Sequence, residues 1–343
     1  MAVALSGGVD SLMALSYLLE QGWECLGLHA SFLPEEGCGR VRRRLAEICR
    51  ELEVPFHHVD LGQAFAQAII QPFVRDYARG LTPNPCSLCN PRIKFGSLLD
   101  RAREYGADFL ATGHYARLDW NAAHPPALFR GRDAAKEQSY FLALVPPDRL
   151  ARACLPLGER RKEEILSAAR ERFWEVPAPS ESQEICFVKD NDYRAFLEKE
   201  SAELPGPGPI LGTDGTWFGE HQGLHRYTIG QRKGLGIAHS EPLYVLCKDV
   251  ANNVLLVGPK RELAGSSCSL SRVNYLLPRE QWPQEIWVQC SYRQKPRPAA
   301  AQAGKSGLTL YFKQPETPAA PGQIGVVYSA KGRVLAGGVI RGG

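Results

Sequence analysis

Apolar and polar positions form blocks along the first part of the chain, and the blocks alternate between two periods. Short continuous apolar runs are typical of buried strands, and apolar residues at a spacing of three to four are typical of helices. Runs of the first kind stand at 2–5, 25–29, 56–60 and 107–114, and the helical spacing marks 11–21, 41–52 and 95–106. This alternation predicts an α/β fold with a doubly wound parallel sheet. Ligands of such sheets bind at the carboxyl ends of the strands.

The pattern changes after about residue 195. The stretch "AELPGPGPILGTDGTWFGEHQGLHRYTIGQRKGLGI" is rich in Gly and Pro and has little helical period, which predicts a small β-rich domain. From residue 262 onward, short strands separated by turns predict a C-terminal β-barrel, with 294–307 as a flexible hairpin loop. We therefore predict three domains, at 1–195, 196–261 and 262–343.

The composition narrows the class of protein only slightly. Hydrophobic residues make up 44% of the chain and charged residues 23%, and the net charge of +4 permits a nucleic-acid partner without requiring one. No apolar run reaches about 18 residues and the N-terminus lacks the basic region of a signal peptide, so we expect no membrane segment and a cytoplasmic protein. The basic runs at 39–44 and 159–162 are interpreted as solvated helix faces, with phosphate contact as the less favoured alternative.

The stretch "SGGVDS", Ser6 to Ser11, follows the first strand and opens the first helix. Glycines let the backbone approach a ligand, and the amides at a helix N-terminus favour an anion. A plain glycine-rich turn would also suit this position. The six residues together resemble the PP-loop of ATP pyrophosphatases, which cleave ATP between the α and β phosphates. The resemblance implies that the loop cradles pyrophosphate and that Asp10 lies near Mg²⁺.

Two cysteines sit three residues apart in "TPNPCSLCNPRIKF", at Cys86 and Cys89. A disulfide between them is disfavoured in a reducing cytoplasm. A structural zinc site needs four ligands, usually two such pairs, and the sequence has no second pair at this spacing. The third interpretation is that the pair belongs to a reaction centre.

Further segments decide between these interpretations. Taken in order with the two motifs above, "LATGHYARL", "KEQSYFLALV", "SQEICFV", "GLHRYTIGQRKGLGI" and "TPAAPGQIGVVY" resemble the tRNA-specific 2-thiouridylase family from residue 4 to the C-terminus. The resemblance implies an enzyme, a tRNA-uridine 2-sulfurtransferase. Such an enzyme would use ATP to adenylate O2 of the wobble uridine, position 34, in tRNAs for Lys, Glu and Gln. Sulfur would then replace AMP at C2.

The resemblance also implies a role for individual positions. The catalytic cysteines are Cys89, as nucleophile or disulfide partner, and Cys186, as sulfur carrier. The ATP-binding positions are Ala4, Leu5, Ser6, Gly7, Gly8, Val9, Asp10, Ser11, Ala30 and Gly113. The tRNA-contacting positions are Asn84, Pro85, Cys86, His114, Lys136, Glu137, Gln138, Ser291, Tyr292 and Gln323.

The sulfur chemistry has two versions. Cys86 stands where the family usually has an acidic residue, which adds a soft ligand beside Cys89 and Cys186. These three could hold a [4Fe–4S] cluster whose remaining iron delivers hydrosulfide, and this is the version we expect. In the other version, Cys186 carries a persulfide and Cys89 resolves it as a disulfide. The expected cofactors are ATP, Mg²⁺ and the cluster, and the expected partners are tRNA and a sulfur donor, either sulfide or a sulfur-carrier protein.

Two other functions explain the sequence less well. A PP-loop amidotransferase or ligase acting on a small metabolite leaves Cys89, Cys186 and the C-terminal β domain unexplained. A non-catalytic RNA-binding protein that only binds ATP is disfavoured by the intact loop and the two motif cysteines. Release of AMP and pyrophosphate that depends on tRNA distinguishes these readings.

Overall fold

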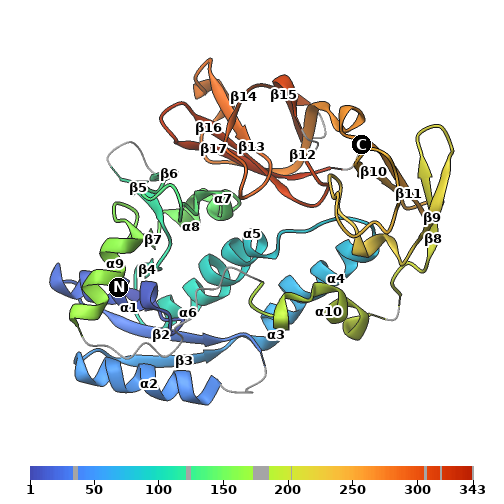
Figure 1. The fold of residues 1–343 in the computed structure, drawn as a ribbon. Helices are drawn as coiled ribbons and strands as arrows, with labels where there is room; N and C mark the ends of the chain where they lie inside the picture. Colours follow the sequence, from blue (N-terminus) through green and yellow to red (C-terminus); the bar gives the residue numbers. More distant parts are fainter. Residues whose placement is uncertain are drawn as a thin grey trace.

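The chain folds into a parallel α/β layer, a small central sheet and a closed barrel that lies above the first layer (Figure 1). The computed structural model of the protein describes residues 1–33, 38–120, 125–172, 185–201, 203–304, 307–316 and 319–341. Among these residues, no helix is long and apolar enough to span a membrane.

The N-terminal part is built on a five-stranded sheet with the order β3-β2-β1-β4-β7, and all its strand pairs are parallel. Its strands are β1 (Ala2–Ala4), β2 (Leu26–Ser31), β3 (Phe56–Asp60), β4 (Leu110–Ala111) and β7 (Ala153–Cys154), beside a two-stranded sheet of β5 (Ala116–Asp119) and β6 (Ala127–Arg130). The parallel order confirms the predicted fold class. The carboxyl ends of β1, β2 and β4 therefore meet at one edge of the sheet.

Helices cover both faces of this sheet (Figure 1). One face packs against α1 (Val9–Glu20), α2 (Cys38–Glu51) and α9 (Lys162–Glu171). The other helices are α3 (Gly62–Phe65), η1 (Ala66–Ile70), α4 (Gln71–Ala78), α5 (Pro85–Cys89), η2 (Asn90–Leu98), α6 (Leu99–Glu104), α7 (Ser139–Leu142), α8 (Pro147–Leu150), η3 (Lys189–Asn191) and α10 (Tyr193–Glu200). Alternate residues of β1 face the two layers, since Ala2 belongs to one buried cluster and Val3 to the other.

The central part is a separate four-stranded sheet with the order β10-β11-β8-β9. Its elements are β8 (Gly208–Gly212), β9 (Trp217–His221), η4 (Leu224–Arg226), β10 (Leu243–Asp249) and β11 (Val254–Pro259), followed by η5 (Lys260–Leu263). Ile210, Val245 and Val257 belong to a small buried cluster of its own. The predicted β-rich central region is confirmed.

The C-terminal part is a closed six-stranded barrel with the order β12-β15-β14-β13-β16-β17. Its elements are β12 (Gly265–Tyr275), η6 (Arg279–Gln281), β13 (Ile286–Gln289), β14 (Arg297–Gly304), β15 (Gly307–Glu316), β16 (Ile324–Ser329) and β17 (Val334–Ile340). The predicted barrel is confirmed, but the hairpin loop expected over 294–307 is wrong, because 297–304 form strand β14. Residues 305–306 of that segment lie outside the described residues. Closure requires a strand between β13 and β15, and this overrides the weak β-propensity of a run rich in Ala and Pro.

The barrel shares its core with the N-terminal part. Ile324, Val326 and Tyr328 belong to the same buried cluster as helices of the α/β layer. The Tyr140 hydroxyl donates to the Ile324 carbonyl at 2.9 Å, and Asn274 Nδ2 donates to the carbonyls of Ala143 and Val145 at 2.9 and 2.8 Å. These contacts hold the barrel against α7 and the residues that follow it.

Candidate active site

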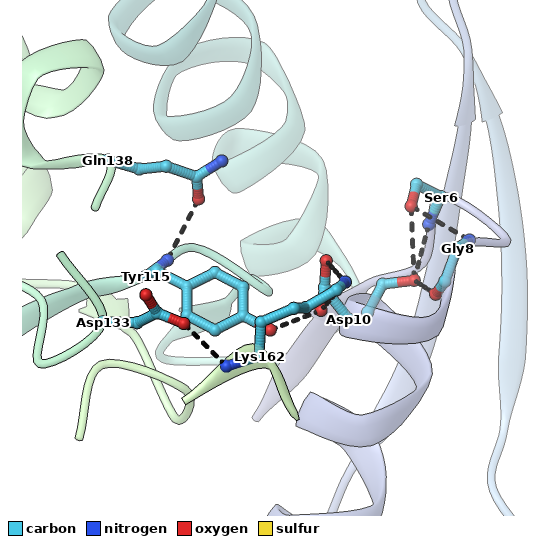
Figure 2. Close-up of polar contacts among 8 residues, drawn as sticks. Ser6, Gly8, Asp10, Tyr115, Asp133, Gln138 and Lys162 are labelled. Carbon is cyan, nitrogen blue, oxygen red and sulfur yellow. Dashed lines mark hydrogen bonds and ion pairs between the residues drawn. The ribbon is translucent and has the colours of Figure 1, made fainter. Parts of the chain in front are cut away.

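The stretch Ser6–Ser11 forms the turn after β1 and the first residues of α1, at the carboxyl edge of the parallel sheet (Figure 2). Gly7 has φ +87°, a conformation that favours glycine. The Ser11 hydroxyl donates to the Gly8 carbonyl at 2.8 Å and accepts from the Ser6 amide at 3.2 Å. The Ser6 hydroxyl accepts from the Gly8 amide at 3.3 Å. The loop is therefore held in shape by its own hydroxyls, with the N-terminus of α1 directed out of the sheet edge.

The flanking positions expected to bind ATP lie at the ends of β1 and β2 and at the start of α1. Ala4 ends β1, Leu5 is buried and donates its amide to the Leu28 carbonyl at 2.9 Å, and Val9 begins α1. Ala30 lies near the end of β2 beside buried His29, whose Nδ1 donates to the Leu5 carbonyl at 2.7 Å. The two strand ends that would flank an adenylate are thus joined through His29.

Asp10 points at a buried lysine. Lys162 Nζ lies 2.7 and 2.8 Å from the two carboxylate oxygens of Asp10, and the Tyr115 hydroxyl donates to Oδ1 at 2.7 Å (Figure 2). The Lys162 side chain is 6% exposed and that of Asp10 32%. Lys162 is the first residue of α9, and its amide donates to Asp133 at 2.8 Å. An ammonium group thus faces the loop that is expected to hold phosphates.

Gly113 packs directly on this cluster. A Cβ atom at Gly113 would lie 2.8 Å from the Asp10 carbonyl carbon, so no other residue fits without displacing the start of α1. Gly113 follows β4 at the same sheet edge. Gly113 therefore lies directly against Asp10, and its role in ATP binding stays a prediction.

The cysteine pair lies on the short helix α5. The side chain of Asn84 accepts from the Ser87 amide at 3.1 Å and caps the helix, and Pro85 occupies the first turn. Cys86 and Cys89 are both half-buried. Desolvation raises the pKa of the Cys86 thiol and raises that of Cys89 to about 12. Both thiols are therefore neutral at pH 7 in the free protein.

Cys186 comes close enough to this pair to interact with it electrostatically. Desolvation and the nearby Cys86 raise the pKa of its thiol, although the residue is exposed. The positive charge of Lys94, on η2, opposes this rise in the pKa of all three thiols but does not cancel it. Residues 182–184 of the motif that contains Cys186 lie outside the described residues.

Within the described part of the chain, no three or more His, Cys, Asp or Glu side chains are grouped so as to hold a metal ion. Cys86, Cys89 and Cys186 are the soft donors that an iron–sulfur cluster needs. Their side chains are not grouped closely enough to ligate one ion together. A single carboxylate, that of Asp10, can suffice for Mg²⁺, which is commonly bound through one or two carboxylates and the phosphates of the substrate.

His114 connects the ATP end to the cysteine end. It is 8% exposed, and burial together with Lys94 places its pKa well below the usual range, so the ring is neutral. Lys94 Nζ lies 3.4 Å from Nε2, and Thr112 Oγ1 lies 2.7 Å from Nδ1. An ammonium only donates, so Nε2 accepts and Nδ1 carries the proton that it donates to Thr112. Contacts thus run from Asp10 through Gly113 and His114 to Lys94, whose charge acts on the three thiols.

The predicted tRNA-contacting turn at 136–138 is partly buried. Glu137 is 5% exposed, and its carboxylate accepts from the Ser139 amide and, at 3.4 Å, from Arg130 Nε. Gln138 Oε1 accepts from the Tyr115 amide at 3.0 Å (Figure 2). Lys136 is half-buried. The turn therefore positions Tyr115, and through it Asp10.

The C-terminal positions assigned to tRNA lie on the side of the barrel that faces the N-terminal part. Ser291 and Tyr292 are exposed, and the Tyr292 ring lies 4.4 Å from that of Phe141, centre to centre. Gln323 Nε2 donates to the Thr82 carbonyl at 2.9 Å. The motif around Gln323 therefore buttresses the segment that leads into the cysteine helix.

Three residues of this site were not predicted from the sequence: Tyr115, Lys94 and Lys162. Tyr115 and Lys94 belong to motifs that were noted, and a role follows only from their contacts. Lys162 belongs to the basic run 159–162, and the interpretation of that run as a solvated face is wrong for Lys162, which is 5% exposed. Its counter-charge stands 152 positions away in the sequence, so no local pattern could indicate it.

Comparison with known proteins adds family models for all three parts. A model described as the tRNA methyl transferase HUP domain matches residues 1–190, and one described as the tRNA methyl transferase PRC-barrel domain matches 194–259. The Aminomethyltransferase beta-barrel domain matches 266–340.

Whole-chain relatives are similar over nearly their full length. A tRNA-specific 2-thiouridylase MnmA of Nitratidesulfovibrio vulgaris is 51% identical over 346 residues, covering 99% of this chain and 99% of the relative. Proteins of the same name from Oleidesulfovibrio alaskensis and Lawsonia intracellularis are 48% and 44% identical, each covering 99% of this chain and 98% of the relative. A solved structure of the U34-tRNA thiolase NcsA from Methanococcus maripaludis with its [4Fe-4S] cluster is 20% identical and covers 59% of this chain and 66% of that chain. Its TM-score of 0.33 carries no argument for this protein.

Proposed function

The chain belongs to the tRNA-specific 2-thiouridylase family, and from this we propose that it replaces O2 of the wobble uridine, position 34, with sulfur in tRNAs for Lys, Glu and Gln. As an enzyme it is a tRNA-uridine 2-sulfurtransferase. The proposal rests above all on the line of contacts from Asp10 through Gly113 and His114 to Lys94. This line would connect a loop that binds phosphates to the lysine whose charge acts on the three thiols.

ATP would bind with its β and γ phosphates on the loop Ser6–Ser11, at the N-terminus of α1. Lys162 would neutralise phosphate charge in the same place, because its ammonium group already faces the loop. Asp10 would share Mg²⁺ with the phosphates and hold Lys162 until they arrive. Ala30 and Gly113 would flank the adenosine part.

The uridine would enter out of its stack, between the cysteine helix and the loop after β4. Asn84, Pro85, Cys86 and His114 are the residues that would meet it. Attack of O2 on the α phosphate forms the adenylated uridine and releases pyrophosphate. His114 is neutral with its proton on Nδ1, so it would position the base rather than compete as a cation for the phosphates.

Sulfur transfer through a persulfide would use Cys186 and Cys89, with a sulfur donor and an external reductant. The outer sulfur of a Cys186 persulfide bonds to C2 of the uridine, and AMP leaves with the former O2. The Cys89 thiolate then attacks the Cys186 sulfur, forming the Cys89–Cys186 disulfide and releasing the new C2 sulfur as the thiocarbonyl. An external dithiol donates the two electrons that restore both cysteines. Lys94 would stabilise the thiolate that each step needs.

The cluster remains the competing hypothesis for sulfur delivery. A [4Fe–4S] cluster on Cys86, Cys89 and Cys186 would leave one iron open to hold hydrosulfide. The donor types support it and the spacing of the described residues does not. The sulfur donor would be sulfide in this case and a sulfur-carrier protein in the persulfide case.

The remaining parts would grip the tRNA. The predicted division into 1–195 for catalysis, and 196–261 and 262–343 for tRNA contact, stays a prediction, as does a cytoplasmic location. Within the N-terminal part, Lys136, Glu137 and Gln138 would support tRNA contact at the turn before α7. Ser291, Tyr292 and Gln323 would add contacts from the barrel, above the cysteine helix.

One experiment tests the function and separates the sulfur routes. Anaerobically purified protein, ATP and unmodified tRNA for Glu should release AMP and pyrophosphate only when tRNA is present. Mass analysis of nucleosides should then find 2-thiouridine when a sulfur donor is added. AMP release without tRNA, or an unmodified wobble uridine with every donor, would show that the proposed function is wrong. Full activity of rigorously iron-free protein, or of Cys86→Ala, would eliminate the cluster, and dependence on iron with sulfide as donor would eliminate the persulfide route.

A further inference from the structure

Four exposed arginines come from three segments that the fold joins. Arg75 lies on α4 and Arg79 directly follows it; three residues later the Thr82 amide donates to the Pro321 carbonyl at 2.7 Å, which ties this segment to the barrel that carries Arg272 on β12. Arg92, on η2, donates to the carbonyl of Ala68, which lies just before α4. Each is near enough to the half-buried Asp76 to lower the pKa of its carboxyl, while desolvation acts more strongly and raises it. One negative charge therefore stands among four positive ones, and the group carries an excess of positive charge.

The four arginine side chains do not serve as ion-pair partners within the described part of the fold. Arg92 donates only to the Ala68 carbonyl, at 2.9 Å. Desolvation and the neighbouring Arg272 and Arg75 lower the pKa of Arg92, so the cluster is repulsive as it stands. Such repulsion is relieved when an anion binds.

Arg272 is held in place by an unusual backbone. Its φ is +48°, in the left-handed region that few residues other than glycine adopt, and it lies in a bulge where the register of β12 and β17 shifts between Ser271 and Asn274. The barrel therefore adopts a disfavoured conformation at the residue that brings an arginine towards three others. Such outliers at a surface are a reason to look for a ligand.

The place of the cluster identifies the anion. Arg92 stands three residues after Cys89, because η2 continues directly from the cysteine helix. A groove of about 510 Å³ begins beside Arg75 and Arg79, but its other wall carries Glu200 and Glu203, which repel phosphate. A polyanion that reaches the cysteines would therefore pass over Arg92 and Arg272 and leave the groove empty.

We propose that Arg75, Arg79, Arg92 and Arg272 form a phosphate-binding track for the tRNA backbone next to the wobble nucleotide. The track spans the N-terminal part and the barrel, so it fixes how the anticodon arm enters the site. This inference rests on the proposed function, since it takes tRNA as the substrate. Several guanidinium groups from separate elements suit successive phosphodiesters, which lie a few ångströms apart along a strand.

Binding of unmodified tRNA for Glu tests the track. Dissociation constants would be measured between about 50 and 200 mM salt for the wild type, Arg92→Gln, Arg272→Gly and the control Arg50→Gln. Arg50 is an exposed arginine on α2, on the far side of the sheet (Figure 1). We expect each track variant to weaken binding about three- to tenfold at low salt and to reduce the salt slope by about one contact. Arg50→Gln should match the wild type.

Arg272→Gly separates binding from folding. Glycine suits φ +48°, so this variant should unfold at a temperature no lower than that of the wild type and still bind RNA less well. Unchanged salt slopes in both track variants would overturn the track and leave the proposed function standing. The track would also be overturned if both track variants lost binding to polyglutamate, used as a model of an acidic protein, and kept their binding to tRNA. Such a result would mean that the surface binds an acidic protein. Wild-type protein that neither binds nor thiolates tRNA would overturn both.

Discussion

The PP-loop end of the candidate site is charged and hydrogen-bonded, whereas the cysteine end of the same sheet edge holds neutral thiols. At the first end, the Asp10 carboxylate already has its ammonium and phenol partners at 2.7–2.8 Å. At the second, desolvation raises the pKa of Cys86, Cys89 and Cys186, and Lys94 opposes it only in part. The ATP end is therefore set before substrate binds, and the sulfur end is not.

This difference suits the order of the reaction that we propose. Adenylation needs fixed charges where phosphate charge develops, and charges that are already placed need no rearrangement during the step. A permanently ionised thiolate beside an activated uridine would instead attack too early or be oxidised while idle. Keeping the thiols neutral until substrate and sulfur are in place avoids both outcomes.

Removal of the charge at Lys162 should have the largest effect. Lys162→Met keeps the length of the side chain and removes the ammonium group that faces the loop. We expect AMP formation that depends on tRNA to fall about a thousandfold, within the range seen when a charge-stabilising group is lost. Arg161→Met, at the exposed neighbouring residue, is the matched control and should stay near the wild-type rate. A Lys162→Met protein that forms AMP normally would show that the ion pair is only structural.

The thiol end should show itself in its dependence on pH. With a pKa of about 12, Cys89 is ionised in only about one molecule in 10⁵ at pH 7. Alkylation of Cys89 by iodoacetamide should therefore rise about tenfold per pH unit, or about a hundredfold from pH 7 to pH 9. Mass spectrometry of the peptides would measure this, with the exposed Cys247 as a check on the reagent. A plateau below pH 9 would mean that Cys89 is held as a thiolate in the free protein.

The smallest effect concerns stability. Asp10→Asn leaves the Lys162 ammonium, 6% exposed, without its counter-charge. Breaking a buried pair in this way costs about 3–5 kcal/mol, and because Asp10 is 32% exposed we expect roughly 1–3 kcal/mol. Urea unfolding would measure the change, and the double variant Asp10→Asn, Lys162→Met should recover part of it. Equal stability of Asp10→Asn and the wild type would contradict a tightly coupled pair.

Much of the architecture follows from the sequence. The strands over 2–5 and 56–60, the helix from 11 and the loop between Ser6 and Ser11 were predicted close to their observed bounds. The reason is that each depends on a local period or on a turn. The hairpin loop over 294–307 failed because barrel closure, a property of the whole sheet, decides that 297–304 pair as a strand.

The glycine-rich loop and the CxxC pair could also be found along the chain, because each is a contiguous pattern. Which distant residues surround them depends on how the chain folds. Lys162 reaches Asp10 across 152 positions, Gln323 reaches Thr82 across 241, and Arg272 joins arginines of α4 and η2. A charge or hydrogen bond acts through space at a few ångströms, and nothing along the chain records which partner folding will bring within that range.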